Sequence, residues 1–222
     1  MKQILLRGAP GTGKSTFARL FLDKVPGAAR LSSGDVLRQT GGDSSSSMNR
    51  GELADSGLVM ELMKQRYSEV KNMNHKILLL DGFPRKLSEL DEWIRNTAPP
   101  IAVVSLVCDD DLIVSKLINR WICNSCGYVY NLFSNGTLKP IAPKKGGVCD
   151  CCSNGELVRR KDDSEPTIRR RLQVFRESEL EVVNYIERQL PETVYISVNT
   201  DSGIDAISNS LMSIVKLRGI TC

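Results

Sequence analysis

Excess charge, long apolar runs and aromatic residues are all scarce in this sequence, and each shortage argues against a class of protein. The formal net charge is only +4 over 222 residues, so no global basic field favours nucleic-acid binding. No apolar run reaches the length that spans a membrane. The N-terminus resembles neither a signal peptide nor an Arg-rich transit peptide, because a strand is expected from the third residue. We therefore expect a cytoplasmic protein with no membrane partner.

Alternating strand and helix patterns predict the fold class. Continuous apolar strands between amphipathic helices are typical of a parallel sheet covered on both faces. We expect a single α/β domain over residues 1–222, with a five-stranded parallel sheet flanked by helices. Strands are expected at 3–8, 28–33, 76–82, 101–108 and 193–198, and helices at 13–24, 52–70, 87–96, 110–120, 165–190 and 204–216.

Two stretches interrupt the alternation of strands and helices and are predicted to be inserts on the core. The first, residues 32–58, contains a Gly/Ser-rich run from Gly41 to Ser47 that is typical of a mobile loop. The second, residues 121–160, has no helical period and includes a hairpin-like segment, NLFSNGTLKP.

The cysteines of the second insert predict a metal site. The chain has seven cysteines, an odd number, and four of them form two Cys-x-x-Cys pairs, which favours a metal over a disulfide framework. Cys151 competes with its neighbours as a ligand, but Cys149 with Cys152 keeps the two-residue gap. Four thiolates make a closed, structural site, more commonly of zinc than of iron, and free reduced thiols remain the alternative. The expected ligands are Cys123, Cys126, Cys149 and Cys152.

A phosphate-binding loop near the N-terminus is the strongest catalytic signal. GAPGTGKS fits the pattern Gly-x-x-x-x-Gly-Lys-Ser between a strand and a helix, where backbone N–H groups and the helix N-terminus face phosphate oxygens. Lys14 supplies a full charge, and Ser15 or Thr16 can reach a magnesium ion bound with the nucleotide. The residues expected to bind ATP here are Gly8, Ala9, Pro10, Gly11, Thr12, Gly13, Lys14, Ser15 and Thr16.

Three further motifs follow in order: SSGDVLR, LLLDGFPR and RRKDDSEPTIRRRL. With the phosphate loop, this set resembles the adenylate kinase branch of the nucleoside monophosphate kinases over nearly the whole chain. The resemblance implies a monomeric P-loop NTPase-like kinase that uses Mg²⁺ and converts ATP and AMP reversibly into two ADP. It also implies a nucleotide-closing lid, which in some members is a small β insert stapled by zinc.

Several residues acquire expected roles from the resemblance. Arginines suit phosphoryl transfer because the guanidinium stays charged and donates several hydrogen bonds. Asp81 is expected to hold magnesium through water, and Asp162 and Asp163 are expected to orient the lid arginines. The implied catalytic residues are Lys14, Arg85, Arg120, Arg160, Arg171 and Asp81. The implied ATP contacts beyond the loop are Lys116 and Arg120, and the implied acceptor contacts are Ser33, Arg38, Gly82, Arg85, Glu89, Arg160 and Arg171.

Departures from the family pattern leave the acceptor base open. Ser15 stands where Gly is common, Lys116 where an Arg often packs on the ATP base, and Glu89 where a Gln reads adenine. A carboxylate accepts but does not donate, so Glu89 matches the N1–H and N2–H of guanine better than N1 and N6 of adenine. AMP is the expected acceptor, and GMP or a broad specificity is the alternative. A Glu89 that faces solvent, or a shifted alignment, would leave AMP in place.

Two readings from other classes remain. The basic runs RRK and RRR beside the cysteines allow a zinc-ribbon nucleic-acid-binding protein, although aromatic content is 5% and no stacking array accompanies them. A P-loop scaffold without catalysis is the other, and the presence of Lys14, Asp81 and the expected arginines argues against it. We expect no nucleic-acid partner.

Overall fold

A five-stranded parallel sheet forms the centre of the computed structural model, which describes residues 1–40, 53–136, 138–144 and 146–216. Its order is β2-β3-β1-β4-β8, and each neighbouring pair is parallel, as predicted. The strands are β1 (Lys2–Gly8), β2 (Ala28–Ser32), β3 (Ile77–Asp81), β4 (Ala102–Val107) and β8 (Val194–Asn199).

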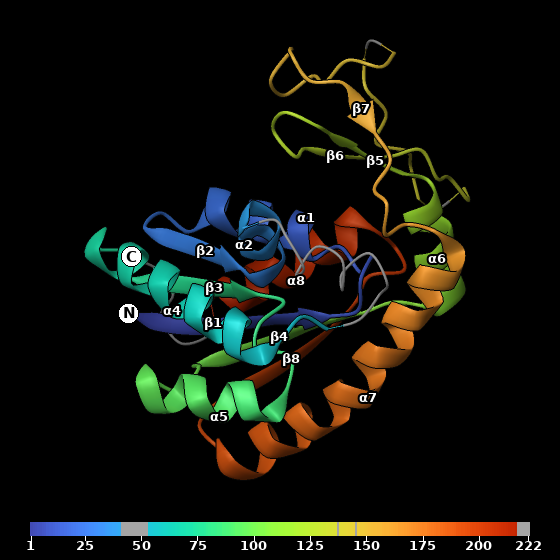
Figure 1. Cartoon of the computed structure of the whole chain (residues 1–222). Coiled ribbons are helices and arrows are strands. Elements are labelled where there is room, and N and C mark those ends of the chain that lie inside the picture. Colours follow the sequence, from blue (N-terminus) through green and yellow to red (C-terminus); the bar gives the residue numbers. More distant parts are fainter. Residues whose placement is uncertain (41–52, 137, 145, 217–222) are drawn as a thin grey trace.

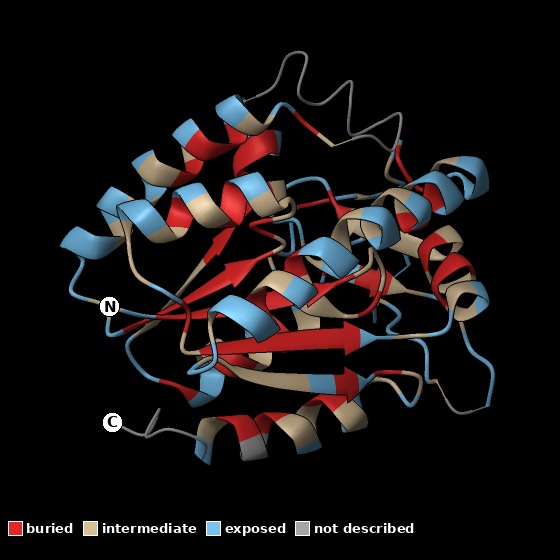
Figure 2. Ribbon diagram, turned by 90° about the horizontal axis from the view of Figure 1, so that it is seen from below, coloured by how far each residue is buried: buried red, intermediate tan, exposed pale blue. Residues whose placement is uncertain are grey.

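Helices cover both faces of this sheet (Figure 1). Side chains alternate across a strand, so Ile4 and Leu6 pack with one set of helices and Leu5 with the other. One core cluster joins the sheet to α1 and α8, and a second joins it to α2, α4, α5 and α7. Figure 2 shows the inner strands β1, β3 and β4 mostly buried and the outer helix faces exposed. The helices are α1 (Lys14–Lys24), α2 (Ser33–Thr40), α4 (Ser56–Asn72), α5 (Leu87–Asn96), α6 (Asp110–Ile118), α7 (Glu165–Gln189) and α8 (Ile204–Lys216).

Three helix boundaries differ from the prediction for local reasons. Gly13 has φ 97° and lies just before α1, because a left-handed residue does not continue a right-handed helix. Asp55 caps α4, its side chain accepting from the Leu58 N–H at 2.9 Å, so this helix starts at Ser56 and not at residue 52. Helix α6 ends at Ile118, and Arg120 opens a strand instead.

A small antiparallel sheet projects from the core beside α6 and the start of α7 (Figure 1). It consists of β5 (Arg120–Cys123), β6 (Val129–Asn131) and β7 (Leu157–Val158), in the order β6-β5-β7. Asn131 bridges antiparallel to Ile141, as expected of a hairpin-like segment. We call residues 120–158 the ribbon.

The strand order creates a crevice at one edge of the central sheet. Strand β1 lies between β3 and β4, and ligands of such sheets bind beyond the carboxyl ends of the strands where the order reverses. The whole predicted Gly41–Ser47 loop lies within residues 41–52, which are outside the described residues. Within the described chain, no helix is both long and apolar enough to cross a membrane.

Candidate active site

The phosphate loop adopts the curled backbone that its glycines predict. Gly8, Gly11 and Gly13 have φ values of 138°, 85° and 97°. A Cβ atom at Gly8 would lie 2.6 Å from the carbonyl oxygen of Leu106, so the neighbouring strand also requires glycine there. Thr12 Oγ1 donates to the Ala9 carbonyl at 2.9 Å and closes the turn. The loop therefore presents its backbone to the crevice at the N-terminus of α1.

Lys14 lies over this loop, and its ammonium is held by backbone oxygens. Nζ donates to the carbonyls of Gly8 at 2.6 Å and Ala9 at 2.8 Å. Burial lowers the pKa of Lys14 to about 7; the nearby Asp81 carboxylate opposes this shift, and nearby arginines, Arg85 foremost, add to it. An anion bound at the loop would favour the charged form.

A cavity of about 560 Å³ opens in front of the phosphate loop. It is lined by the carboxyl ends of the central strands, the ribbon, helices α2, α6 and α7, and the start of α8. Ten basic residues line it against three acidic ones, Asp81, Asp162 and Asp205, which suits a polyanion. The basic residues are Arg7, Lys14, Arg30, Arg38, Arg85, Lys116, Arg120, Lys139, Arg160 and Arg171.

The cavity brings together most of the predicted nucleotide-binding residues. Ala9, Ser33 and Glu89 are exceptions and do not line it. Ser33 Oγ instead donates to the Gly82 carbonyl at 2.7 Å. The predicted residues on the cavity wall are Gly8, Pro10, Gly11, Thr12, Gly13, Lys14, Ser15, Thr16, Arg38, Asp81, Gly82, Arg85, Lys116, Arg120, Arg160 and Arg171.

At the base of the ribbon, two buried aspartates hold three arginines. Arg120 forms a bidentate pair with Asp163. Arg160 forms another with Asp162, at 2.9 and 2.8 Å, and Arg171 Nη1 donates to the same Asp162 carboxylate at 2.7 Å. Burial opposes ionisation of Asp162, but the two arginines hold its pKa below its usual value. Burial also lowers the pKa of Arg171 to about 10. The guanidinium groups are thus fixed in direction.

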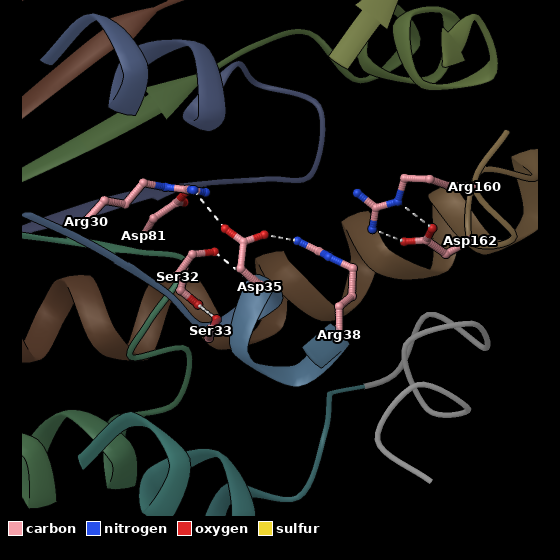
Figure 3. Close-up of polar contacts among 9 residues, drawn as sticks. Arg30, Ser32, Ser33, Asp35, Arg38, Asp81, Arg160 and Asp162 are labelled. Carbon is pink, nitrogen blue, oxygen red and sulfur yellow. Dashed lines mark hydrogen bonds and ion pairs between the residues drawn. The ribbon is translucent and has the colours of Figure 1, made fainter. Parts of the chain in front are cut away.

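The opposite wall carries Arg38 and Arg85. Arg38 Nη2 contacts Asp35 Oδ1 at 2.5 Å, and Arg85 Nε donates to the Gly82 carbonyl at 2.9 Å. Figure 3 places the Arg38 group opposite the Arg160–Asp162 pair. Two sets of arginines therefore face each other across the cavity, one from the sheet side and one from the ribbon side.

Glu89 is buried rather than turned to solvent, with 4% of its surface exposed. One carboxylate oxygen accepts from the backbone N–H of Arg85 at 2.8 Å and of Lys86 at 3.4 Å, which caps α5. The other accepts from Ser56 Oγ at 2.9 Å. The solvent-facing alternative is therefore wrong, and the carboxylate is committed to contacts within the protein.

The ribbon cysteines form one cluster. The four Sγ atoms of Cys123, Cys126, Cys149 and Cys152 lie within 4.8 Å of one another. Two Sγ–Sγ distances are 3.6 Å, close to the roughly 3.8 Å that a tetrahedral site with Zn–S bonds of about 2.3 Å requires. Cys151 is exposed and outside the cluster. The donor set therefore fits zinc.

Two arginines of the site, Arg7 and Arg30, were not predicted, and neither was Lys139 of the ribbon. Arg7 lies in β1 and donates to Glu179 at 2.9 and 2.5 Å and to the Pro84 carbonyl at 2.5 Å. Arg30 lies in β2 and donates to Asp81 and Asp35. The only sequence signal was a charged residue inside an apolar strand, in LLRG and AARLSS.

The parallel sheet, the phosphate loop and the facing arginines define a P-loop phosphotransferase. The chain belongs to the adenylate kinase family: a family model described as "Adenylate kinase" matches residues 6–190. The predictions of family and enzyme class are thereby confirmed.

Curated relatives support this assignment. A protein named "Adenylate kinase" from Thermodesulfovibrio yellowstonii is 33% identical over 97% of this chain and 100% of its own length. One from Clostridium tetani is 34% identical over 84% of this chain and 87% of its own. One from Thermotoga maritima is 31% identical over 97% of each chain.

Proposed function

We propose that this chain is a magnesium-dependent adenylate kinase that transfers a phosphoryl group reversibly between ATP and AMP and forms two ADP. The observation that carries the proposal is the single cavity that joins the phosphate loop to two facing sets of arginines. Phosphoryl transfer asks a protein mainly for positioning and for neutralisation of charge. A cavity with this charge excess meets both demands.

Each set of residues has a role in this proposal. The loop N–H groups and Lys14 hold the outer phosphates of ATP, while Arg38 and Arg85 hold the phosphate of AMP. Arg120, Arg160 and Arg171 stabilise charge on the transferred group. No general base is needed, because the acceptor is already a phosphate anion. Lys116 and Arg120 contact ATP, and Ser33 and Gly82 shape the acceptor side from behind.

Asp81 and Ser15 provide oxygen donors on the cavity wall, and Mg²⁺ prefers oxygen ligands. These residues therefore fit magnesium, which neutralises phosphate charge when it is bound with ATP. In the ribbon, the four thiolates fit a zinc ion that stabilises a segment with a small apolar core.

In this proposed function, residues 1–222 form one kinase domain, with inserts at 32–58 and 121–160 that close on the two nucleotides. Closure excludes water, which would otherwise accept the phosphoryl group. A monomer suffices, because the described chain supplies all of these groups. Three of the arginines near the cysteines, Arg120, Arg160 and Arg171, pair with Asp162 or Asp163 and line the cavity, which supports nucleotide binding over nucleic-acid binding.

The stoichiometry tests this function. The zinc-loaded protein, supplied with MgATP and AMP, should form two ADP for each AMP consumed, and ADP alone should yield ATP and AMP. Omission of magnesium should abolish both directions. ATP hydrolysis without AMP consumption, or no turnover, would overturn the proposal.

A further inference from the structure

Arg30 connects two parts of the site that the proposed mechanism treats separately. Its Nε and Nη2 donate to Asp81 Oδ2 at 2.9 and 2.6 Å, and its Nη1 donates to Asp35 Oδ2 at 2.8 Å. Asp35 in turn contacts Arg38. Figure 3 shows the resulting row of alternating charges, Asp81–Arg30–Asp35–Arg38. We call these four residues the charge row.

The fold explains why Arg30 can hold both carboxylates. Strand β2 pairs in parallel with β3, and Arg30 lies beside Leu79. Asp81 is two residues further along, and therefore on the same face of the sheet as Leu79. Asp35 belongs to the first turn of α2, which follows β2 directly, and Arg38 to its last turn. The planar guanidinium can bridge two acids, which a lysine ammonium on a single bond does less well.

Side-chain exposure increases along the charge row from Asp81 to Arg38. The Asp81 side chain is 5% exposed, Arg30 is 26% exposed, and Asp35 and Arg38 are 40% and 42% exposed. Arg30, Arg38 and Asp81 all line the cavity. The inner end is thus a nearly inaccessible carboxylate beside the phosphate loop, and the outer end is an accessible arginine on the sheet side of the cavity.

We propose that Arg30 is a positioning residue that couples the acceptor side of the cavity to the carboxylate of Asp81. It orients Arg38 through Asp35, and it offsets the negative charge of Asp81. This inference rests on the proposed function, because it assigns the AMP phosphate to Arg38 and magnesium to Asp81. Loss of the Arg30 guanidinium should therefore have two effects of opposite sign. AMP should bind more weakly, and magnesium should strengthen ATP binding by a larger factor.

Equilibrium binding to Arg30→Gln tests both effects without turnover. Calorimetry with AMP alone should give a dissociation constant raised about tenfold, equivalent to about 1.4 kcal/mol. For a non-hydrolysable ATP analogue, the ratio of dissociation constants without and with Mg²⁺ should rise at least about threefold, since Asp81 then lacks the guanidinium with which it is paired. Arg95→Gln is the matched control, because Arg95 is exposed on α5, outside the cavity lining, and pairs with Asp91 on the same helix. It should change neither quantity.

A double-mutant cycle separates positioning from bulk charge. In an Asp35→Asn background, Arg30→Gln should have less than half its effect on AMP binding, yet its full effect on the magnesium ratio. If Arg30→Gln does not fold, Asp35→Asn tests the charge row instead, because Asp35 is partly exposed. Asp35→Asn should weaken AMP binding without changing the ratio of dissociation constants without and with Mg²⁺. Arg30→Lys should restore the ratio but not AMP binding.

Three results would overturn the coupling. Loss of AMP binding with an unchanged magnesium ratio would mean that Arg30 only contacts the acceptor. Additive effects in the cycle would mean that Asp35 transmits nothing. Unchanged binding in Arg30→Gln would remove any role. Failure of the proposed function is distinguishable, because the wild-type protein would then bind no AMP and form no ADP.

Discussion

Arg120 and Asp163 form a bidentate ion pair, with Nε–Oδ2 and Nη2–Oδ1 distances of 2.7 and 2.6 Å. Arg120 opens the first strand of the ribbon, and Asp163 lies between its last strand and α7. The pair therefore closes the base of the ribbon, where the chain leaves the core and returns. Both side chains are largely buried, at 13% and 3% exposed.

Removing this acid should disorient Arg120 and leave its charge unpaired. We expect Asp163→Ala to lower kcat about a hundredfold, as loss of a charge-stabilising donor does in other enzymes. Breaking one side of a buried ion pair should also cost about 3 kcal/mol of unfolding free energy. Steady-state kinetics and denaturant unfolding measure the two effects. Asp111→Ala, which alters a side chain that is 86% exposed, is the control, and an unchanged kcat in Asp163→Ala would contradict the role.

Lys14 predicts a pH dependence of ATP binding. Burial, as the largest cause, lowers its pKa to about 7, so the free protein loses this charge above pH 7. A bound phosphate favours the protonated form, so the dissociation constant for ATP should rise above pH 7, approaching tenfold per unit. Titrations from pH 7 to 9 should show this slope in the wild type and a flat profile in Lys14→Met.

The same shift has a consequence for stability without nucleotide. Between pH 7 and 10.5 the unfolded chain holds a proton on Lys14 that the folded chain has released. Unfolding free energy should therefore rise with pH over this window, by up to about 1.4 kcal/mol per unit from this residue. Urea unfolding at several pH values should show a smaller rise in Lys14→Met; equal slopes would refute a depressed pKa.

Zinc removal should unfold the ribbon and leave the core folded. We expect one zinc per chain by elemental analysis, and a chelator or Cys123→Ala should lower the melting temperature and abolish phosphoryl transfer. Cys151→Ala is the matched control, since this exposed thiol lies outside the cluster. Gly155→Ala should also weaken zinc binding, because a Cβ there would lie 2.0 Å from Cys123 Sγ. Full activity of the metal-free protein would contradict a structural zinc.

Arg7 and Glu179 form an ion pair beneath the cavity, with side chains 4% and 16% exposed. Glu179→Ala should lower the unfolding free energy by about 3 kcal/mol, because it leaves Arg7 buried without its acid. The double variant Arg7→Leu/Glu179→Ala should recover most of this loss. Chemical unfolding of the single and double variants measures these free energies. A double variant as unstable as Glu179→Ala would show that the unpaired charge of Arg7 is not the cause of the loss.

Local patterns were enough to predict much of this molecule. Strand and helix periods, the phosphate loop and the cysteine spacing each depend on neighbouring residues, so the five-stranded sheet and the cysteine cluster followed from them. Arg160 of RRKDD also lines the cavity, as the family resemblance implied.

Contacts between distant segments could not be predicted in this way. Arg7 meets Glu179 across 172 residues, and Arg30 meets Asp81 across 51. The first pair depends on how α7 packs against β1, and the second on the register of β2 with β3; no local period specifies either. Glu89 shows the same limit: its residue type suggested base recognition, and only its neighbours in space show that it caps a helix.

ADP formation from MgATP, with AMP, GMP, CMP and UMP offered separately as acceptors, tests the central claim most directly. Because Glu89 is committed to the cap of α5 and to Ser56, the account predicts that AMP wins by a wide margin and that Glu89→Gln keeps this preference. If GMP equals or exceeds AMP, and Glu89→Gln moves the preference back toward AMP, then Glu89 reads the acceptor base and the assignment of AMP as acceptor is wrong.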